Sequence, residues 1–350
     1  MNKHNVWLLL ASAAVFSSCA NPDNKTHPAK EKQDEIIFEK SSVLERTEDV
    51  YEIPTLKKLF VINRNGSHLY EKPEKSSTIL ASLEFGELIE VINETNEWYQ
   101  IKERIGRSYI SNGNQIETSG WEVVHIPKEN AGLATQVYLT PEDLYKTTDK
   151  VQAKGKLQID MISAGEFERA KQNQSNHIIQ KTNLAQEKDS VLTITLNNGL
   201  KKKYVSTPSA EETMIVYTYL GHIDFLQAYI LSLGYYEGGE CKLYSTEDGT
   251  ELASIIDNPS ISPDRKHLIS MSTDPYDNDT DLELHTIGTD RKIKQALQAS
   301  FSSWMVSLEP QDIYWIDNST FAFAVLHSKV FWDADGNSNK NYQYLKIKIL

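Results

Sequence analysis

The most constraining feature of this sequence is a run in which apolar and polar residues alternate up to an Asn-Gly pair. In the segment SVLTITLNNGLKKKYVS, Leu192, Ile194 and Leu196 occupy every second position and Asn198-Gly199 follows. Alternation with a period of two places these side chains on one face of a strand, and Asn-Gly favours the tight turn of a hairpin. The segment therefore predicts a hairpin with one buried face.

Turn signals of the same kind recur toward the C-terminus. Gly238-Gly239 and Asp248-Gly249 separate segments that are rich in Tyr, Ile and Leu. Such pairs favour tight turns between antiparallel strands. We therefore expect a second series of hairpins between residues 225 and 255.

The segment SISPDRKHLISMS resembles the Ser-Pro-Asp-Gly-Lys turn that opens strands in β-propeller blades, with Arg265 in place of the glycine. About 200 residues supply too few strands for a closed propeller with four strands per blade. We expect residues 121–350 to form a β-rich domain, either a sandwich or an incomplete propeller. Thr140 as a cap and Pro141 in the first turn predict a short helix near 141–150.

The segment EWYQIKE predicts a strand with two different faces. Tyr99 and Ile101 share one face, whereas Trp98 and Lys102 share the other, because successive side chains of a strand point to opposite sides. Five or so short segments of this kind within about 60 residues predict a small barrel over residues 56–118. The fold class is therefore mainly β, with a small barrel followed by a larger β-rich domain.

The order of motifs in the barrel region resembles that of a bacterial SH3 domain. A proline follows the first core strand, a G-x-x-x-x-V motif and an aromatic pair come next, and a Tyr-Ile element ends the region; the matching residues are Pro73, Gly86, Val91, Trp98, Tyr99, Tyr109 and Ile110. Ser108 stands where the family has glycine, and the usual Leu-Asn-Val-Arg start is absent. The resemblance implies an SH3-like barrel, and members of the family bind wall peptides or other proteins.

Trp98 is the residue of this region with a candidate ligand role. Its position on the polar face allows it to stack on a peptide or a sugar, and Tyr70 and Tyr109 on neighbouring strands extend the same surface. The alternative is that Trp98 packs over a loop and closes the end of the barrel, because large aromatic residues are commonly half-buried.

The N-terminus carries the features of a secretory signal. Lys3 precedes an apolar run over residues 6–16, and Ser17 and Ser18 come directly before Cys19. The run is about half as long as a membrane-spanning helix of roughly 20 residues. A basic start, a short apolar run and small residues are typical of a signal peptide. Two interpretations are open: a lipoprotein signal in which Cys19 has a specific role, or an ordinary signal peptide in which the cysteine occurs by chance.

The placement of Cys19 resembles the lipobox of bacterial lipoproteins, which implies cleavage after residue 18 and acylation of the Cys19 thiol. Two or more acyl chains anchor a protein firmly to a membrane. Residues 19–55 are mostly polar and charged, which is the composition of a flexible tether. Ala20 lacks the acidic side chain that retains some lipoproteins at an inner membrane, which favours an outer-membrane lipoprotein facing the periplasm.

The charge of the chain restricts its partners. The 350 residues carry a net charge of −13. Nucleic-acid phosphates require Lys and Arg, so an acidic chain is not expected to bind nucleic acid. The hydrophobic share of 39% is sufficient for ordinary cores, and the length favours two domains.

A search for catalytic motifs finds none that is complete. Cys241 is the second cysteine of the chain, and it lies in the strand-like segment GGECKLYS, where a free cysteine behaves as a small hydrophobic residue. The chain lacks the H-E-x-x-H, G-x-S-x-G and glycine-rich phosphate-loop motifs. His222 and Asp224 share one face of a strand, without a nucleophile beside them in the sequence.

Oxygen-bearing residues alternate in the segment DADGNSNKN, where Asp333, Asp335, Asn337 and Asn339 are two positions apart. Ca²⁺ takes six to eight oxygen ligands, but the glycine and the terminal glutamate of an EF-hand loop are not in register here. Turns also prefer Asp, Asn and Gly. The segment is therefore either a calcium loop or a solvated turn, and no other cofactor is expected.

Taken together, these features predict a non-catalytic, membrane-anchored envelope lipoprotein. Its SH3-like and β-rich domains are expected to bind a cell-wall peptide or another envelope protein. Bacterial SH3 domains often accompany wall-cutting enzymes, so a peptidoglycan hydrolase, or a regulator of one, is the alternative. A purely structural lipoprotein is a third possibility.

Overall fold

A computed structural model describes residues 48–111, 113–147, 153, 155–172, 176–180, 184–209, 211–307 and 313–350. The predicted signal peptide, Cys19 and most of the predicted tether lie outside the described residues. The chain divides into two compact units. The described residues of the first unit are 108–111 and 113–116, and the second unit contains Glu45–Arg107 and Glu117–Leu350.

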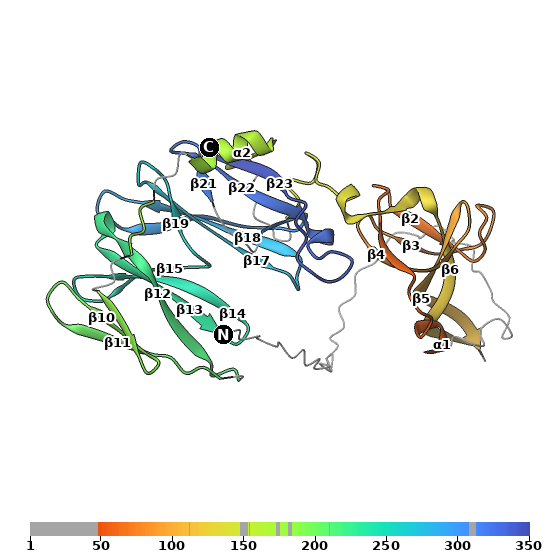
Figure 1. Cartoon of the computed structure of the whole chain (residues 1–350), viewed down its shortest axis with the longest axis horizontal. Coiled ribbons are helices and arrows are strands. Elements are labelled where there is room, and N and C mark those ends of the chain that lie inside the picture. Colours follow the sequence, from red (N-terminus) through yellow and green to blue (C-terminus); the bar gives the residue numbers. More distant parts are fainter. Residues whose placement is uncertain are drawn as a thin grey trace, which may run out of the picture. The chain divides into compact units, whose positions relative to one another are not determined.

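The N-terminal domain is an antiparallel sheet that curves around its own core (Figure 1). The strand order is β3-β2-β6-β5-β4-β1-β7. The strands are β1 (Lys57–Val61), β2 (Ser67–Tyr70), β3 (Ile79–Leu83), β4 (Leu88–Glu94), β5 (Trp98–Ser111), β6 (Asn114–Pro127) and β7 (Ala131–Gly132), and a short helix α1 (Glu48–Tyr51) precedes them. The buried core is built from alternate residues of these strands: Leu59, Val61, Leu69, Ile89, Val91, Ile101, Ile105, Val124, Ile126 and Ala131.

This sheet extends further along the chain than the sequence indicated. β6 continues to Pro127, and β7 pairs with β1 through Val61 and Ala131. The predicted end of the domain at residue 118 is therefore too early. The part of β6 beyond residue 118 was not predicted, because β6 is a long strand. No Asn-Gly or Gly-Gly pair near residue 118 signals a turn there.

The described residues of the C-terminal domain form four antiparallel sheets, whose strands are labelled in Figure 1. Sheet one has the order β11-β10-β9, sheet two β12-β13-β14-β15, sheet three β16-β17-β18-β19 and sheet four β20-β22-β23-β8, with β21 also pairing with β22. The strands are β8 (Leu157–Ile162), β9 (Ala185–Lys188), β10 (Val191–Thr195), β11 (Lys201–Val205), β12 (Ile215–Ile223), β13 (Ala228–Tyr235), β14 (Gly238–Ser245), β15 (Glu251–Ile255), β16 (Ser260–Ile261), β17 (His267–Asp274), β18 (Asp279–Ile287), β19 (Ile293–Phe301), β20 (Trp304–Val306), β21 (Tyr314–Trp315), β22 (Thr320–His327) and β23 (Gln343–Ile349). Short 3-10 helices lie at Lys128–Asn130, Ala134–Gln136, Asp224–Leu226 and Ser328–Val330.

Successive sheets share buried cores. One core joins sheets one and two, with Leu192 packing in the same cluster as Leu231. A second joins sheets two and three, and the third and largest joins sheets three and four. Sheets two and three have their four strands in chain order, whereas sheet four pairs its last strand, β23, with β8 from the start of the domain. The structure therefore confirms a β-rich domain of several antiparallel sheets that pack on one another in sequence.

The expected hairpins are present, but the turn between β13 and β14 lies at Tyr236 and Glu237, and Gly238 and Gly239, the predicted turn, open β14. β10 and β11 pair in register from Val191↔Val205 to Thr195↔Lys201. Gly199 takes a φ of 83°, a left-handed conformation that glycine adopts without steric cost. Arg265, which stands where the blade-opening turn has glycine, also takes a left-handed φ of 63°. Arg265 therefore adopts the backbone conformation that glycine favours, although it carries a side chain.

The predicted helix near 141–150 is wrong where the structure describes it. Residues 141–145 form a turn, and residues 148–150 lie outside the described residues. The turn is held by the rest of the domain, because the indole Nε1 of Trp304 donates a 3.2 Å hydrogen bond to the backbone carbonyl of Leu144. This carbonyl is engaged by a residue distant in sequence rather than by a helical amide.

A helix occurs instead at α2 (Ala164–Gln172), which the sequence analysis missed. Ser163 and Glu166 form a reciprocal cap, in which the Ser163 backbone amide donates to the carboxylate and the Glu166 amide donates to the Ser163 hydroxyl. This Ser-x-x-Glu spacing is a signal for a helix start that was available in the sequence. Phe167 and Ala170 form the buried face of α2. No helix among the described residues is long and apolar enough to span a membrane.

Candidate functional site

Trp98, the predicted ligand residue of the N-terminal domain, is buried. It opens β5, and only 7% of it is exposed. Its ring meets that of Tyr70 edge to face, with 5.3 Å between the ring centroids. The expected alternation is confirmed, because Ile101 lies in the core and Tyr99 packs against it. Trp98 is not partly exposed as a ligand role would require, and its burial against the Tyr70 ring agrees with the alternative that it packs within the domain.

On the face of β5 that points away from the core, the chain that precedes β1 covers Lys102. Its ammonium group donates to the backbone carbonyls of Tyr51 and Ile53 at 2.9 and 3.1 Å and forms a 2.9 Å ion pair with Glu90. The Lys102 hydrogen bond is the main cause that lowers the pKa of the Glu90 carboxyl. The chain that precedes β1 therefore occupies part of the polar face that the sequence left open.

The two tyrosines that were predicted to extend the Trp98 surface keep part of their side chains accessible. Tyr70 is half-buried at the end of β2. Tyr109 is also half-buried and belongs to the compact unit that contains Ser108–Ile116. Each tyrosine thus retains surface for a ligand, and neither depends on an exposed Trp98.

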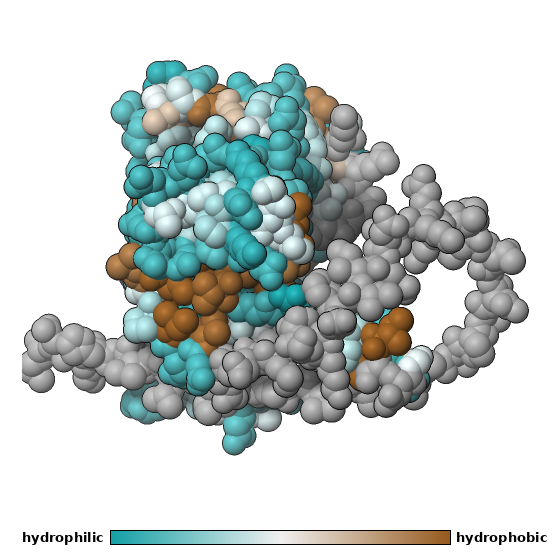
Figure 2. Space-filling model, turned by 90° about the vertical axis from the view of Figure 1, so that its right-hand side faces the viewer, coloured by the Kyte–Doolittle hydropathy of each residue, from teal (hydrophilic) through white to brown (hydrophobic). Residues whose placement is uncertain are grey.

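Apolar residues remain on the surface of the N-terminal domain. Figure 2 shows a band of hydrophobic residues across a face that is otherwise mainly hydrophilic. Exposed apolar side chains of the domain include Ile79, Leu88 and Leu56, which are 49%, 44% and 61% exposed. Contiguous exposed apolar surface is more often used for binding than scattered single residues are.

The segment proposed as a calcium loop is an ordered turn in the structure. The Asp333 carboxylate accepts backbone hydrogen bonds from Asp335 and Asn337 at 2.9 and 2.8 Å. Asn339 is buried, and its amide donates to the carbonyl of Val330 at 2.9 Å. Within the described ranges, no group of three or more His, Cys, Asp or Glu side chains is placed to hold a metal ion. Calcium binding here stays a prediction.

Cys241 lies inside sheet two and is 2% exposed. Burial is the largest cause that raises the pKa of its thiol to about 12, so the reactive thiolate is rare at neutral pH. Burial of Cys241 therefore agrees with the structural role that its sequence context indicated.

His222 and Asp224, which the sequence places on one face of a strand, lie close together in the structure. The distance between His222 Nδ1 and an Asp224 carboxylate oxygen is 3.0 Å.

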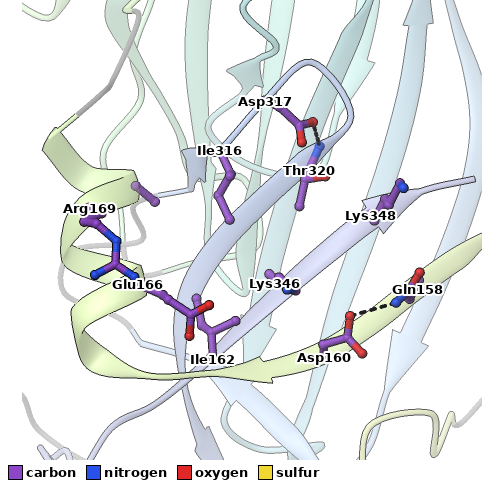
Figure 3. Close-up of a pocket in the computed structure, with 11 residues that line it drawn as sticks. Gln158, Asp160, Ile162, Glu166, Arg169, Ile316, Asp317, Thr320, Lys346 and Lys348 are labelled. Carbon is purple, nitrogen blue, oxygen red and sulfur yellow. Dashed lines mark hydrogen bonds between the residues drawn. The ribbon is translucent and has the colours of Figure 1, made fainter.

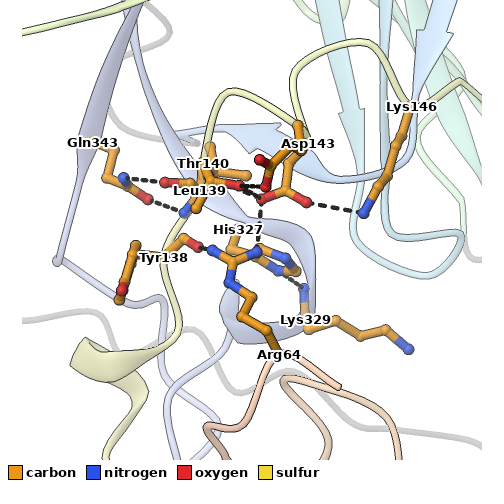
Figure 4. Close-up of polar contacts among 10 residues, drawn as sticks. Arg64, Tyr138, Leu139, Thr140, Asp143, Lys146, His327, Lys329 and Gln343 are labelled. Atoms are coloured by element: carbon orange, nitrogen blue, oxygen red, sulfur yellow. Dashed lines mark hydrogen bonds and ion pairs between the residues drawn. The ribbon is translucent and has the colours of Figure 1, made fainter. Parts of the chain in front are cut away.

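A polar cluster that the sequence did not reveal lies where the N-terminal domain meets the segment that follows it (Figure 4). Both parts belong to the second compact unit. Arg64 Nη1 donates to Asp143 Oδ2 at 2.7 Å, and Nη2 donates to the backbone carbonyl of Tyr138. The guanidinium carbon lies 4.2 Å from the Phe85 ring centroid and 5.3 Å from that of Tyr138. Arg64 is thus held by charge and by two aromatic faces.

The Asp143 carboxylate is the centre of this cluster and is 3% exposed. It also accepts from Lys146 Nζ at 2.9 Å, and from the backbone amide and hydroxyl of Thr140 at 2.8 and 3.0 Å. Burial alone would raise the pKa of Asp143, but the hydrogen bonds from Lys146, Thr140 and Arg64 outweigh it and hold the pKa well below its usual range. Each partner stabilises the ionised form.

His327 lies beside this cluster, with its ring edge to face with Phe85 at 5.3 Å. Burial lowers the pKa of His327 to about 4, while the charge of Asp143 acts in the opposite direction. His327 is therefore neutral at pH 7. Its Nδ1 accepts a hydrogen bond from the backbone amide of Lys329, which fixes the orientation of the ring.

Comparison with known proteins gives one match. Residues 65–114 match the bacterial SH3 domain family. The matched segment runs from just before β2 to the first residue of β6, and it contains Tyr70, Trp98 and Tyr109. A search of curated proteins finds no match to this chain. The chain is thus mainly β, with a bacterial SH3 domain followed by a larger β-rich region.

Proposed function

We propose that this protein is an envelope lipoprotein that binds peptidoglycan through its bacterial SH3 domain. The observation that carries the proposal is the family match over residues 65–114, because bacterial SH3 domains commonly bind cell-wall peptidoglycan. The half-buried Tyr70 and the exposed Ile79 and Leu88 of the same segment offer aromatic and apolar contacts for a wall peptide. Another envelope protein is the other candidate partner.

The proposed anchor is the N-terminal cysteine of the mature chain. The apolar run and the small residues before Cys19 support acylation at this thiol, and Ala20 favours transport to the outer membrane. An acylated cysteine followed by a polar segment places the folded domains near the membrane while leaving them free to reach the wall.

Replacing Cys19 tests the anchor. Cys19→Ala removes the acceptor thiol, so the variant is expected to lose all label when cells are grown with a fatty-acid analogue. Cys241→Ala, which removes the buried thiol, is the matched control and is expected to keep the label. A Cys19→Ala variant that still carries the label would show that the lipoprotein assignment is wrong.

We further propose that the protein does not itself cut the wall. The burial of Cys241 and the raised pKa of its thiol support this proposal. So does the chain's lack of the zinc-peptidase and serine-hydrolase motifs. A hydrolase needs a nucleophile or an activated water molecule. The buried Cys241 thiol does not supply a nucleophile, and the motifs that would supply either group are missing from the sequence.

Co-sedimentation with purified peptidoglycan sacculi tests both parts of the proposal. The mature chain is expected to sediment with the sacculi, and the supernatant is expected to contain no released muropeptides. Release of muropeptides would favour the hydrolase alternative. A chain that stays in the supernatant would exclude wall binding and leave an envelope protein as the partner.

A further inference from the structure

A pocket of about 580 Å³ lies on one face of sheet four (Figure 3). Its floor consists of neighbouring residues on adjacent strands, because Lys346 pairs with Asp160 and Lys348 pairs with both Gln158 and Thr320. The alternate residues of the same strands point to the opposite face and form the buried core between sheets three and four. The pocket is therefore built on a rigid sheet, and its volume is within the range of small-ligand sites.

Helix α2 and the turn after β21 form the walls of this pocket. Arg169 and Glu166 reach it from α2, and Ile316 and Asp317 reach it from the turn. The helix is fixed in place by Phe167, which stacks on another ring of sheet four at 4.5 Å between centroids. Walls that are packed in this way keep the lining side chains near one position.

The carboxylates of the pocket already accept hydrogen bonds from the protein. Asp317 accepts from the backbone amides of Ser319 and Thr320 at 2.7 and 2.8 Å. Glu166 accepts from the amide and the hydroxyl of Ser163, each at 3.0 Å. Asp160 accepts from the Gln158 side chain at 2.9 Å. These acids therefore have structural roles in a turn, a helix cap and a strand.

The cations of the pocket are not hydrogen-bonded to these carboxylates, although the charges of Lys346 and Arg169 contribute to lowering the pKa of the Glu166 carboxyl after the hydrogen bonds from Ser163. Among the described residues, no carboxylate lies within ion-pair distance of Lys346, Lys348 or Arg169. Figure 3 shows the two lysines on the central strand and Arg169 on the neighbouring helix. Side chains two apart on a strand lie about 6.5–7 Å from each other on the same face. Two lysine ammonium groups and one guanidinium thus remain available to an anionic ligand.

We propose that this pocket binds a short peptide segment that carries separated carboxylate groups. Two acidic residues two apart in an extended peptide have the same spacing as Lys346 and Lys348, and Arg169 offers the fork geometry that suits a carboxylate. Ile162 and Ile316 add apolar side chains to the lining of the pocket. The proposal concerns the C-terminal domain and does not depend on wall binding by the SH3 domain.

The acids around the pocket restrict the ligand further. Glu166, Asp160 and Asp317 keep their negative charge near the three cations, so a dense polyanion meets repulsion from them and from the net charge of −13. Two separated carboxylates bring less negative charge next to these acids than a dense polyanion does. The pocket therefore favours an acidic peptide over a nucleic acid or an anionic membrane surface.

Titration calorimetry with a matched pair of peptides tests this proposal. The purified mature chain is expected to bind acetyl-Leu-Glu-Ala-Glu-amide and to bind acetyl-Leu-Gln-Ala-Gln-amide at least about tenfold more weakly, because the amides lose the charge-assisted hydrogen bonds. The double variant Lys346→Gln/Lys348→Gln is expected to weaken binding of the acidic peptide at least about tenfold.

The matched control is Lys201→Gln/Lys203→Gln. These lysines have the same spacing on the exposed strand β11 and the same charge change, but they lie outside the pocket. The control is expected to bind like the unmodified chain. Equal binding of the two peptides, equal weakening by the two double variants, or binding only to anionic lipid vesicles would overturn the proposal.

Discussion

Trp98→Ala is expected to lower the free energy of unfolding by about 3–5 kcal/mol, the usual cost of removing a buried tryptophan. Trp98 is 7% exposed and meets the Tyr70 ring edge to face, so its removal leaves a cavity in the domain. Sacculus binding by the folded fraction is expected to persist, because a buried indole does not present a surface to a ligand. Chemical denaturation at 25 °C measures the loss of stability.

Trp332→Ala is the matched control for this experiment. Trp332 is 42% exposed, so the same change of residue type is expected to cost less than about 1 kcal/mol. A Trp98→Ala variant that unfolds like the unmodified chain but no longer sediments with sacculi would show that Trp98 contacts the ligand. That result would restore the ligand role that its sequence position indicated.

Asp143→Asn is expected to lower the free energy of unfolding by about 2–3 kcal/mol at pH 7. Breaking a fully buried ion pair typically costs about 3–5 kcal/mol, and the smaller value follows because the Arg64 and Lys146 side chains are 35% and 60% exposed and therefore screened by water. The variant keeps the size of the side chain but removes the charge that both cations contact. Denaturation midpoints of the two proteins measure this difference.

The difference between the two proteins is also expected to depend on pH. The pKa of Asp143 is lower in the folded chain than in the unfolded chain, where it is about 3.9. Its contribution is therefore fully present above that pH and is lost as the pH falls toward the folded value. His327 becomes protonated over part of the same range, and Asp143→Asn is expected to lower its pKa further because the variant removes a charge that raises it.

Asp277→Asn is the control for this second experiment, because Asp277 is exposed in the turn between β17 and β18. It is expected to change stability by less than about 0.5 kcal/mol. An Asp143→Asn variant as stable as the unmodified chain at pH 7, or a difference that grows below pH 4, would contradict the role assigned to the Arg64 cluster.

The hairpins were predictable because their signals are local. Alternation of Leu192 and Ile194 and the Asn198-Gly199 pair all lie within one short segment, and the turn forms where these residues place it. Arg265 shows that the blade-opening turn tolerates a left-handed arginine, so the resemblance was informative despite the missing glycine. Local chemistry was sufficient for this hairpin because both of its strands and its turn lie within one short segment.

The features that were not predictable depend on residues far apart in the chain. The turn at 141–145 is stabilised by Arg64 and Trp304, which lie on opposite sides of it in the sequence. Helix propensity at Thr140 and Pro141 could not reveal either contact. Trp98 was placed on the correct face of its strand, but its burial is due in part to Tyr70. The pocket on sheet four requires the pairing of β8 with β23, which joins the two ends of the domain.

The measurement that tests the proposed function most directly is photo-crosslinking in living cells. A photoreactive phenylalanine analogue at Leu88, which is exposed in the matched SH3 domain, is compared with one at Lys203 on β11. Peptidoglycan binding predicts that muropeptides are attached at position 88 and are absent at position 203 after the wall is digested. Attachment of a protein alone at position 88, with no muropeptide, would contradict the account.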